Sequence, residues 1–114
     1  MPEVWRLFEF KGFRIPVHLI SLTGAGPETL DLIGGAHLRN YERQMGLFPG
    51  MTFVDVGCGI GRDAFQLLDV LDAGGRYVGI DVTRDSIAWC QRHVTARDAR
   101  FTFHHFDTVN ELYN

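Results

Sequence analysis

One run of the sequence, an apolar segment leading into three closely spaced glycines, most constrains the fold of this chain. Residues 52–56 have the composition of a buried strand, and Gly57-Cys58-Gly59-Ile60-Gly61 follows directly. A glycine-rich turn lets the backbone approach a ligand closely, and the amides of the following helix then face an anionic group. The run therefore predicts a ligand-binding strand–turn–helix unit.

The same alternation of strand and helix continues toward the end of the chain. Apolar residues recur at helical spacing in residues 64–71 and 85–94, residues 77–80 and 101–106 have the pattern of short strands, and residues 109–113 begin a helical pattern. Strands that alternate with helices are typical of parallel sheets with right-handed crossovers. The fold class predicted is therefore α/β.

The first 46 residues have a different pattern. Residues 4–22 are rich in aromatic and branched side chains, broken by Gly12 and Pro16, which fits either a strand pair or an irregular packing arm. A helix is expected from Pro27, with an interruption at Gly34-Gly35, and a second helix over residues 36–45. We therefore expect a mostly helical extension or lid at 1–46 and an α/β domain at 47–114.

Three acids occupy the ends of the expected strands. Asp55 is on the first strand, Asp81 follows the second and Asp107 follows the third. Ligands of open parallel sheets bind outside the carboxyl ends of the strands, and an acid about twenty residues past the glycine turn can hold ribose hydroxyls. One acid alone would more simply cap a strand or helix. Three in register with the glycine turn favour a nucleoside site.

The run from Phe53 to Gly61, an acid followed by three alternating glycines, resembles the first motif of class I S-adenosylmethionine-dependent methyltransferases. Residues 77–82 resemble their second motif, and residues 100–107 resemble their third strand, although Phe106 stands where many members have glycine. A dinucleotide fingerprint is disfavoured because Arg62 replaces its third glycine. The resemblance covers residues 47–107 and implies a Rossmann-like three-layer methyltransferase fold, of which this chain holds the first three parallel strands.

The resemblance implies S-adenosylmethionine as the cofactor and a role for each matching residue. Asp55 would lie near the methionine amino group, Asp81 would take both ribose hydroxyls, and Asp107 would approach the adenine amino group. The glycine loop would wrap the methionine portion, and Val82 would pack on the adenine. The implied cofactor site consists of Asp55, Gly57, Cys58, Gly59, Gly61, Asp81, Val82 and Asp107.

Other conspicuous side chains have simpler interpretations. Arg62 and Asp63 are expected to be a solvent-facing pair, while His37 and Tyr41 would either lie over the cofactor or form a packed helix face. Adjacent residues of a strand point to opposite faces, so the pair His104-His105 predicts no metal site. Four N-terminal aromatic residues are expected to pack in the core or a lid: Trp5, Phe8, Phe10 and Phe13.

Composition excludes several classes of protein. With 46% apolar and 22% charged residues, the chain is expected to be globular, and a net charge of -3 without a Lys/Arg block gives no nucleic-acid signature. No stretch approaches the ~20 apolar residues of a membrane span. Cys58 and Cys90 fit no metal or redox motif, which favours free thiols and a cytoplasmic location.

The predicted function is methyl transfer from S-adenosylmethionine to an acceptor that these residues do not identify. The alternatives are a non-catalytic S-adenosylmethionine-binding or interaction module and, less favoured, an NAD-dependent oxidoreductase. Members of the resembled family have seven strands, so the chain is expected to be truncated and incomplete for catalysis. The edge of residues 52–56 would then be uncovered, which predicts self-association.

Overall fold

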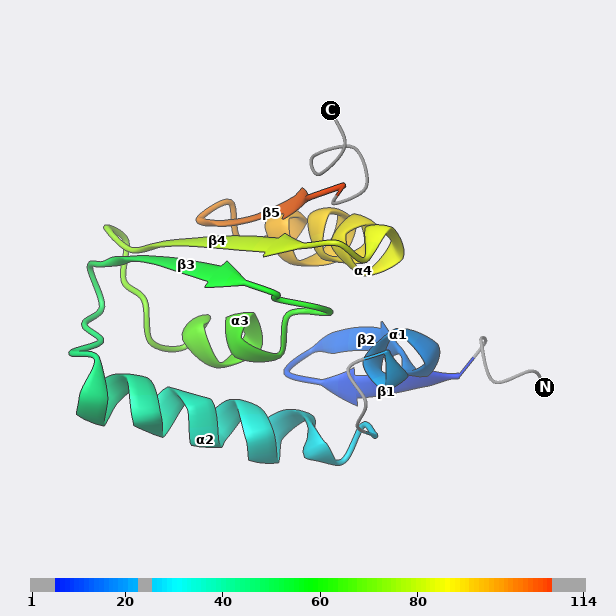
Figure 1. The fold of residues 1–114 in the computed structure, drawn as a ribbon, viewed down its shortest axis with the longest axis horizontal. Helices are drawn as coiled ribbons and strands as arrows, with labels where there is room; N and C mark the ends of the chain where they lie inside the picture. Colours follow the sequence, from blue (N-terminus) through cyan, green and yellow to red (C-terminus); the bar gives the residue numbers. More distant parts are fainter. Residues whose placement is uncertain (1–5, 23–25, 108–114) are drawn as a thin grey trace.

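The computed structural model describes residues 6–22 and 26–107, and its second half is a parallel sheet with helical crossovers (Figure 1). Its elements are β3 (Thr52–Val56), α3 (Arg62–Leu67), β4 (Arg76–Asp81), α4 (Arg84–Cys90), the π-helical segment η2 (Gln91–Thr95) and β5 (Phe101–His105). The strands lie in the order β3-β4-β5, and both pairs are parallel. This arrangement confirms the α/β prediction, because parallel neighbours need a crossover between them.

The helix predicted at residues 85–94 is present, with a changed last turn. Ile87, Cys90 and Val94 are all buried, as their spacing predicts. The backbone widens into η2 after α4, and the Thr95 hydroxyl donates a 2.6 Å hydrogen bond to the carbonyl oxygen of Phe101. This bond ties the end of the helix to the start of β5.

The N-terminal segment forms a strand pair, which resolves the two alternatives left open by its sequence. Strands β1 (Leu7–Phe10) and β2 (Phe13–Pro16) are antiparallel, and the short helix α1 (Val17–Ser21) follows them. Lys11 and Gly12 connect the strands with φ angles of 50° and 80°. Two consecutive positive φ angles suit the twist of a two-residue hairpin.

Helix α2 (Thr29–Gln44) is continuous, so the predicted interruption at Gly34-Gly35 is wrong. Gly34 is buried where α2 crosses α3, and a Cβ atom there would lie 3.0 Å from the carbonyl oxygen of Arg62. The glycine therefore permits close helix packing instead of ending the helix. The end of the helix agrees with prediction, since Gly46 follows it with a φ of 66°.

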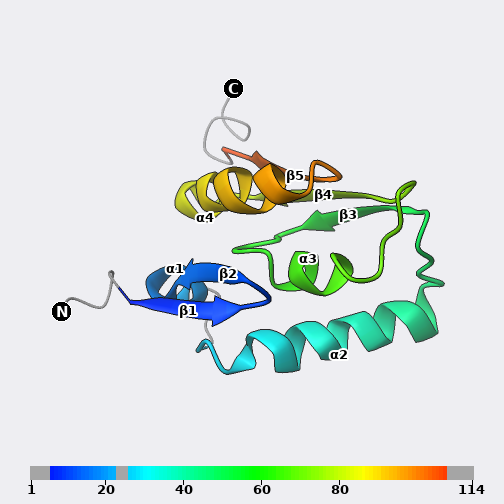
Figure 2. The same cartoon turned by 180° about the vertical axis from the view of Figure 1, so that it is seen from behind.

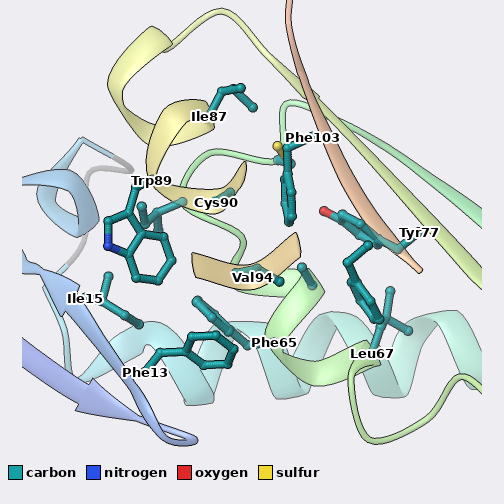
Figure 3. Close-up of a cluster of buried hydrophobic side chains, with 14 of the residues drawn as sticks. Phe13, Ile15, Phe65, Leu67, Tyr77, Ile87, Trp89, Cys90, Val94 and Phe103 are labelled. Atoms are coloured by element: carbon teal, nitrogen blue, oxygen red, sulfur yellow. The ribbon is translucent and has the colours of Figure 1, made fainter. Parts of the chain in front are cut away.

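One face of the sheet and the helices beside it enclose the hydrophobic core (Figure 3). Tyr77 stacks on Phe101 with ring centroids 5.2 Å apart, and Phe13 from the hairpin lies 5.2 Å from Phe65 and 6.2 Å from Trp89. The predicted core role is thus confirmed for Phe13, and Phe8 and Phe10 pack against the same cluster. Trp5 lies outside the described residues.

Strand β3 is buried on one face only, so its prediction as a buried strand holds for Phe53 and not for the opposite face. Phe53 faces the core, whereas Val54 and Val56 are 57% and 80% exposed on the opposite face. Within the part of the chain that the structure describes, β3 is an edge strand paired only with β4. An apolar strand that would suit the centre of a sheet therefore has one open face and one open edge.

The hairpin and α1 lie beyond the carboxyl ends of the three parallel strands, as the views from both sides show (Figures 1 and 2). Helix α3 lies between β3 and α2 in the same views. The helical pattern at residues 109–113 falls outside the described residues. Among the helices that are described, none has the length and apolar character needed to cross a membrane.

Candidate functional site

The glycine loop after β3 adopts a backbone that favours glycine at three positions. Gly57, Gly59 and Gly61 have φ angles of 83°, 56° and 95°, values at which other residues are strained. The amides of Gly57 and Cys58 both donate to the carbonyl oxygen of Ile80, at 2.7 and 3.1 Å. These bonds hold the loop against the end of β4, directly beside Asp81.

A cavity of about 280 Å³ opens at this end of the sheet. It is lined by five of the residues predicted for the cofactor: Asp55, Gly57, Cys58, Gly59 and Asp81. The other three do not line it. Gly61 is buried directly before α3, Val82 is exposed directly after the end of β4, and Asp107 is half-buried after β5. His37 also lines the cavity, which agrees with one of the two alternatives left open for it, whereas Tyr41 does not line it. The sequence did not indicate a place in the pocket for the remaining lining residues: Leu19, Leu22, Arg62, Asp63, Thr83 and Ser86.

Gly79 is a structural requirement of the site that was missed from the sequence. A Cβ atom at this position of β4 would lie 2.9 Å from the Cys58 sulfur, 2.9 Å from the Phe103 ring and 3.0 Å from the Tyr77 ring. Without a side chain at Gly79, the glycine loop can pack directly on the strand. The available signal was a glycine inside an apolar strand, which often marks a close approach.

Asp55 is held at the pocket by the phenol of Tyr77. The Tyr77 hydroxyl donates a 2.6 Å hydrogen bond to Oδ2 of Asp55. Burial raises the pKa of Asp55 above its ordinary value, and the hydrogen bond from Tyr77 opposes that rise. The carboxylate is therefore partly desolvated, and a cationic ligand group beside it would stabilise its charge.

Asp81 stands at the carboxyl end of β4, beside the glycine loop, and also lines the cavity. Its Oδ2 accepts a 3.0 Å hydrogen bond from the backbone amide of Thr83, the residue that precedes α4. This bond orients the carboxylate at the pocket wall, where a ligand hydroxyl has a preformed acceptor.

Asp63 is buried, so the predicted solvent-facing pair with Arg62 is wrong for this residue. Its side chain accepts hydrogen bonds from Nδ1 of His37 at 2.8 Å and from the hydroxyl of Tyr41 at 2.5 Å. Both donors come from α2, which packs over the start of α3. Tyr41 also packs on Phe53, with ring centroids 4.9 Å apart, whereas His37 lines the pocket.

The two cysteines are free thiols, as predicted, and both are buried. Burial, and to a smaller extent the nearby carboxylates of Asp55 and Asp81, raise the pKa of the Cys58 thiol to about 12. A thiol with this pKa stays protonated at neutral pH and is a poor nucleophile. Cys58 therefore contributes shape to the pocket and not reactivity.

Histidines 104 and 105 take no part in this pocket. His104 lies 3.4 Å from the Thr102 hydroxyl, and Nε2 of His105 lies 3.1 Å from the carbonyl oxygen of Val82. Among the residues described, no group of three or more His, Cys, Asp or Glu side chains is placed to hold a metal ion.

Replacing Tyr77 by phenylalanine is expected to raise the pKa of Asp55 further, because the lost hydrogen bond favours the ionised carboxylate. A carboxyl whose folded-state pKa exceeds its unfolded value contributes stability at low pH, and this contribution is lost as pH rises through the folded-state pKa. Tyr77→Phe should therefore lose more unfolding free energy at about pH 7 than at about pH 3. Urea denaturation at both pH values measures this, and equal losses would contradict it.

Known proteins are similar to the part of this chain that forms the parallel sheet. A family model described as a methyltransferase domain matches residues 47–112. Arsenite methyltransferase from Aquipseudomonas alcaligenes is 33% identical to this chain over 57 residues, which are 50% of this chain and 16% of that protein.

Two solved structures resemble the fold. The [4+2]-cyclase SpnF is 26% identical with a TM-score of 0.52, covering 68% of this chain and 27% of the cyclase. A SAM-dependent methyltransferase from Aquifex aeolicus is 22% identical with a TM-score of 0.52, covering 75% of this chain and 43% of that protein. The expected Rossmann-like α/β fold is thereby confirmed. The chain spans less than half the length of each of these proteins.

Proposed function

This chain belongs to the methyltransferase-domain family, and from that premise we propose that its pocket binds S-adenosylmethionine and that the whole protein transfers the sulfonium methyl to an acceptor. One observation carries the proposal. The left-handed glycine loop, Asp55 and Asp81 line a single cavity at the carboxyl end of the sheet, which is where open α/β sheets bind ligands.

The methionine end of the cofactor suits the Asp55 side of the pocket. That end carries an α-ammonium and a sulfonium, both positive, and Asp55 is a partly desolvated carboxylate that a cation would stabilise. A Cβ atom on Gly57 would meet no protein atom within 4 Å, so open space borders the loop where a ligand would lie. These two features support the methionine portion lying along the glycine loop.

The nucleoside end suits the side of Asp81 and β4. We place the ribose hydroxyls on the Asp81 carboxylate, which Thr83 already orients. The cavity of about 280 Å³ is slightly smaller than the usual range of ligand pockets, ~300–1,000 Å³. The adenine would therefore extend past it, over exposed Val82 and toward Asp107.

When bound, S-adenosylmethionine supplies an electrophilic methyl group. The residues of this chain bind and orient the cofactor, and positioning of this kind is a large part of catalysis by group transfer. The raised pKa of Cys58 keeps this loop thiol protonated at neutral pH, so it would be a poor acceptor for that methyl group.

Isothermal titration of the 114-residue chain with S-adenosylhomocysteine and, separately, with NAD tests the proposal. We expect binding of S-adenosylhomocysteine and no measurable heat with NAD, because Arg62 replaces the third glycine of the dinucleotide fingerprint. Preferential binding of NAD would favour an oxidoreductase. Binding of neither ligand would leave an interaction module as the better explanation.

We further propose that the isolated chain self-associates through β3 and its open face. Val54 and Val56 present exposed apolar side chains on an edge strand, and unprotected apolar edges tend to pair with other chains. Sedimentation at micromolar concentration should show assemblies in the wild type and fewer in Val56→Lys. Leu32→Lys, which changes an exposed apolar residue on α2, is the matched control and should leave assembly unchanged. A monomeric wild-type chain would contradict this proposal.

A further inference from the structure

The charges around the pocket leave one group of the proposed cofactor without a partner. Three carboxylates line the cavity, from Asp55, Asp63 and Asp81, and they suit the positive groups and hydroxyls of S-adenosylmethionine. The α-carboxylate of its methionine end needs a donor instead. Of the lining residues, His37 and Arg62 are the ones able to carry positive charge.

We propose that His37, held in place by Asp63, donates a hydrogen bond from Nε2 to the α-carboxylate of the cofactor. The inference rests on the proposed function and adds a binding residue on α2, outside the strands and loops that the resemblance covers. It assigns the two ends of the amino-acid group to different elements, the ammonium to Asp55 on β3 and the carboxylate to α2.

Asp63 orients His37, because each of its carboxylate oxygens accepts a hydrogen bond from a side chain of α2. Oδ1 accepts from His37 at 2.8 Å and Oδ2 accepts from the Tyr41 hydroxyl at 2.5 Å. The residue is only 8% exposed. Of the three acids, Asp63 is therefore the one committed to orienting a neighbour, which is how a carboxylate fixes the ring of a functional histidine.

The hydrogen bond with Asp63 determines what His37 can offer to a ligand. An ionised carboxylate only accepts, so Nδ1 of His37 carries a proton and Nε2 remains for other partners. The His37 side chain is 46% exposed at the pocket wall. A ring that carries a proton on Nε2 as well can donate from this atom to an anion such as a ligand carboxylate.

The experiment compares two ligands that differ in the amino-acid group. The wild-type chain and His37→Gln are titrated with S-adenosylhomocysteine and with 5′-methylthioadenosine, which keeps the nucleoside and lacks the ammonium and the carboxylate. We expect His37→Gln to weaken S-adenosylhomocysteine by about 10- to 100-fold, the scale of one lost charged hydrogen bond. Affinity for 5′-methylthioadenosine should be unchanged, which also shows that the variant is folded.

His104→Gln, an exposed histidine outside the pocket, is the matched control and should match the wild type in every titration.

The inference is wrong if His37→Gln weakens both ligands equally or neither. It is also wrong if Arg62→Gln loses S-adenosylhomocysteine selectively while His37→Gln does not. A wild-type chain that binds neither ligand would overturn the proposed function, and this inference with it. A wild-type chain that binds both, with no selective loss in His37→Gln, would leave the proposed function standing and remove only the role of His37.

Discussion

Replacing Asp81 by alanine should remove most of the affinity of the chain for S-adenosylhomocysteine. The carboxylate would accept hydrogen bonds from both ribose hydroxyls, and each charged hydrogen bond is worth about 1.5–3 kcal/mol. Losing both should cost about 3 kcal/mol or more, which is over about 100-fold in the dissociation constant. Isothermal titration calorimetry measures the loss directly.

The alanine variant also removes the acceptor for the Thr83 amide, so part of its effect is structural. Asp81→Asn keeps an oxygen for Thr83 and removes the negative charge, and it should still bind much more weakly than the wild type. Asp85→Asn changes an exposed acid on α4 that does not line the pocket, and it should bind normally. Normal affinity in both Asp81 variants would show that the ribose lies elsewhere.

Replacing Gly79 by alanine should lower the free energy of unfolding by about 1–3 kcal/mol, the usual cost of overpacking a core. The new methyl group would lie 2.9 Å from the Cys58 sulfur and from the Phe103 ring, and 3.0 Å from the Tyr77 ring. All three neighbours are buried, so none can move into solvent. A loss of this size should lower the melting temperature by roughly 5–20 °C.

Gly74→Ala is the matched control, because it makes the same chemical change in a turn. A Cβ atom at Gly74 would lie 3.5 Å from the nearest side-chain oxygen, that of Asp72, which is ordinary contact. Thermal unfolding followed by circular dichroism should separate the two variants. Equal melting temperatures for Gly79→Ala and Gly74→Ala would show that the loop can move away from β4 at little cost.

Local sequence was sufficient to predict the strand–helix alternation and the central part of the site. Strand β3 was predicted with its observed bounds, because an apolar run followed by alternating glycines defines where a strand must end. Asp81 was identified from its distance along the chain to the glycine loop. Because β3 and β4 pair in parallel, Asp81 at the end of β4 lies beside the glycine loop. The hydrogen bonds from the amides of Gly57 and Cys58 to the carbonyl oxygen of Ile80 show this.

Contacts between elements decided what the sequence did not reveal. Gly34-Gly35 has the composition of a helix break, yet α2 continues because Gly34 packs against the backbone of α3. Arg62-Asp63 has the composition of a surface pair, yet α2 covers Asp63 and supplies both of its hydrogen-bond donors. In each case the deciding partner is distant along the chain, so no local pattern records it.

The exposure of a side chain likewise depended on tertiary structure. The hydrophobicity of residues 52–56 predicted a buried strand, but the burial of a strand depends on what covers each of its faces. The helices cover the face of Phe53, and the described residues leave the face of Val54 and Val56 open. The sequence by itself therefore determined which segments form the sheet and where its glycine loop lies. Only the packing of α2, α3 and the hairpin decided which polar side chains line the pocket, because their donors and acceptors meet only in three dimensions.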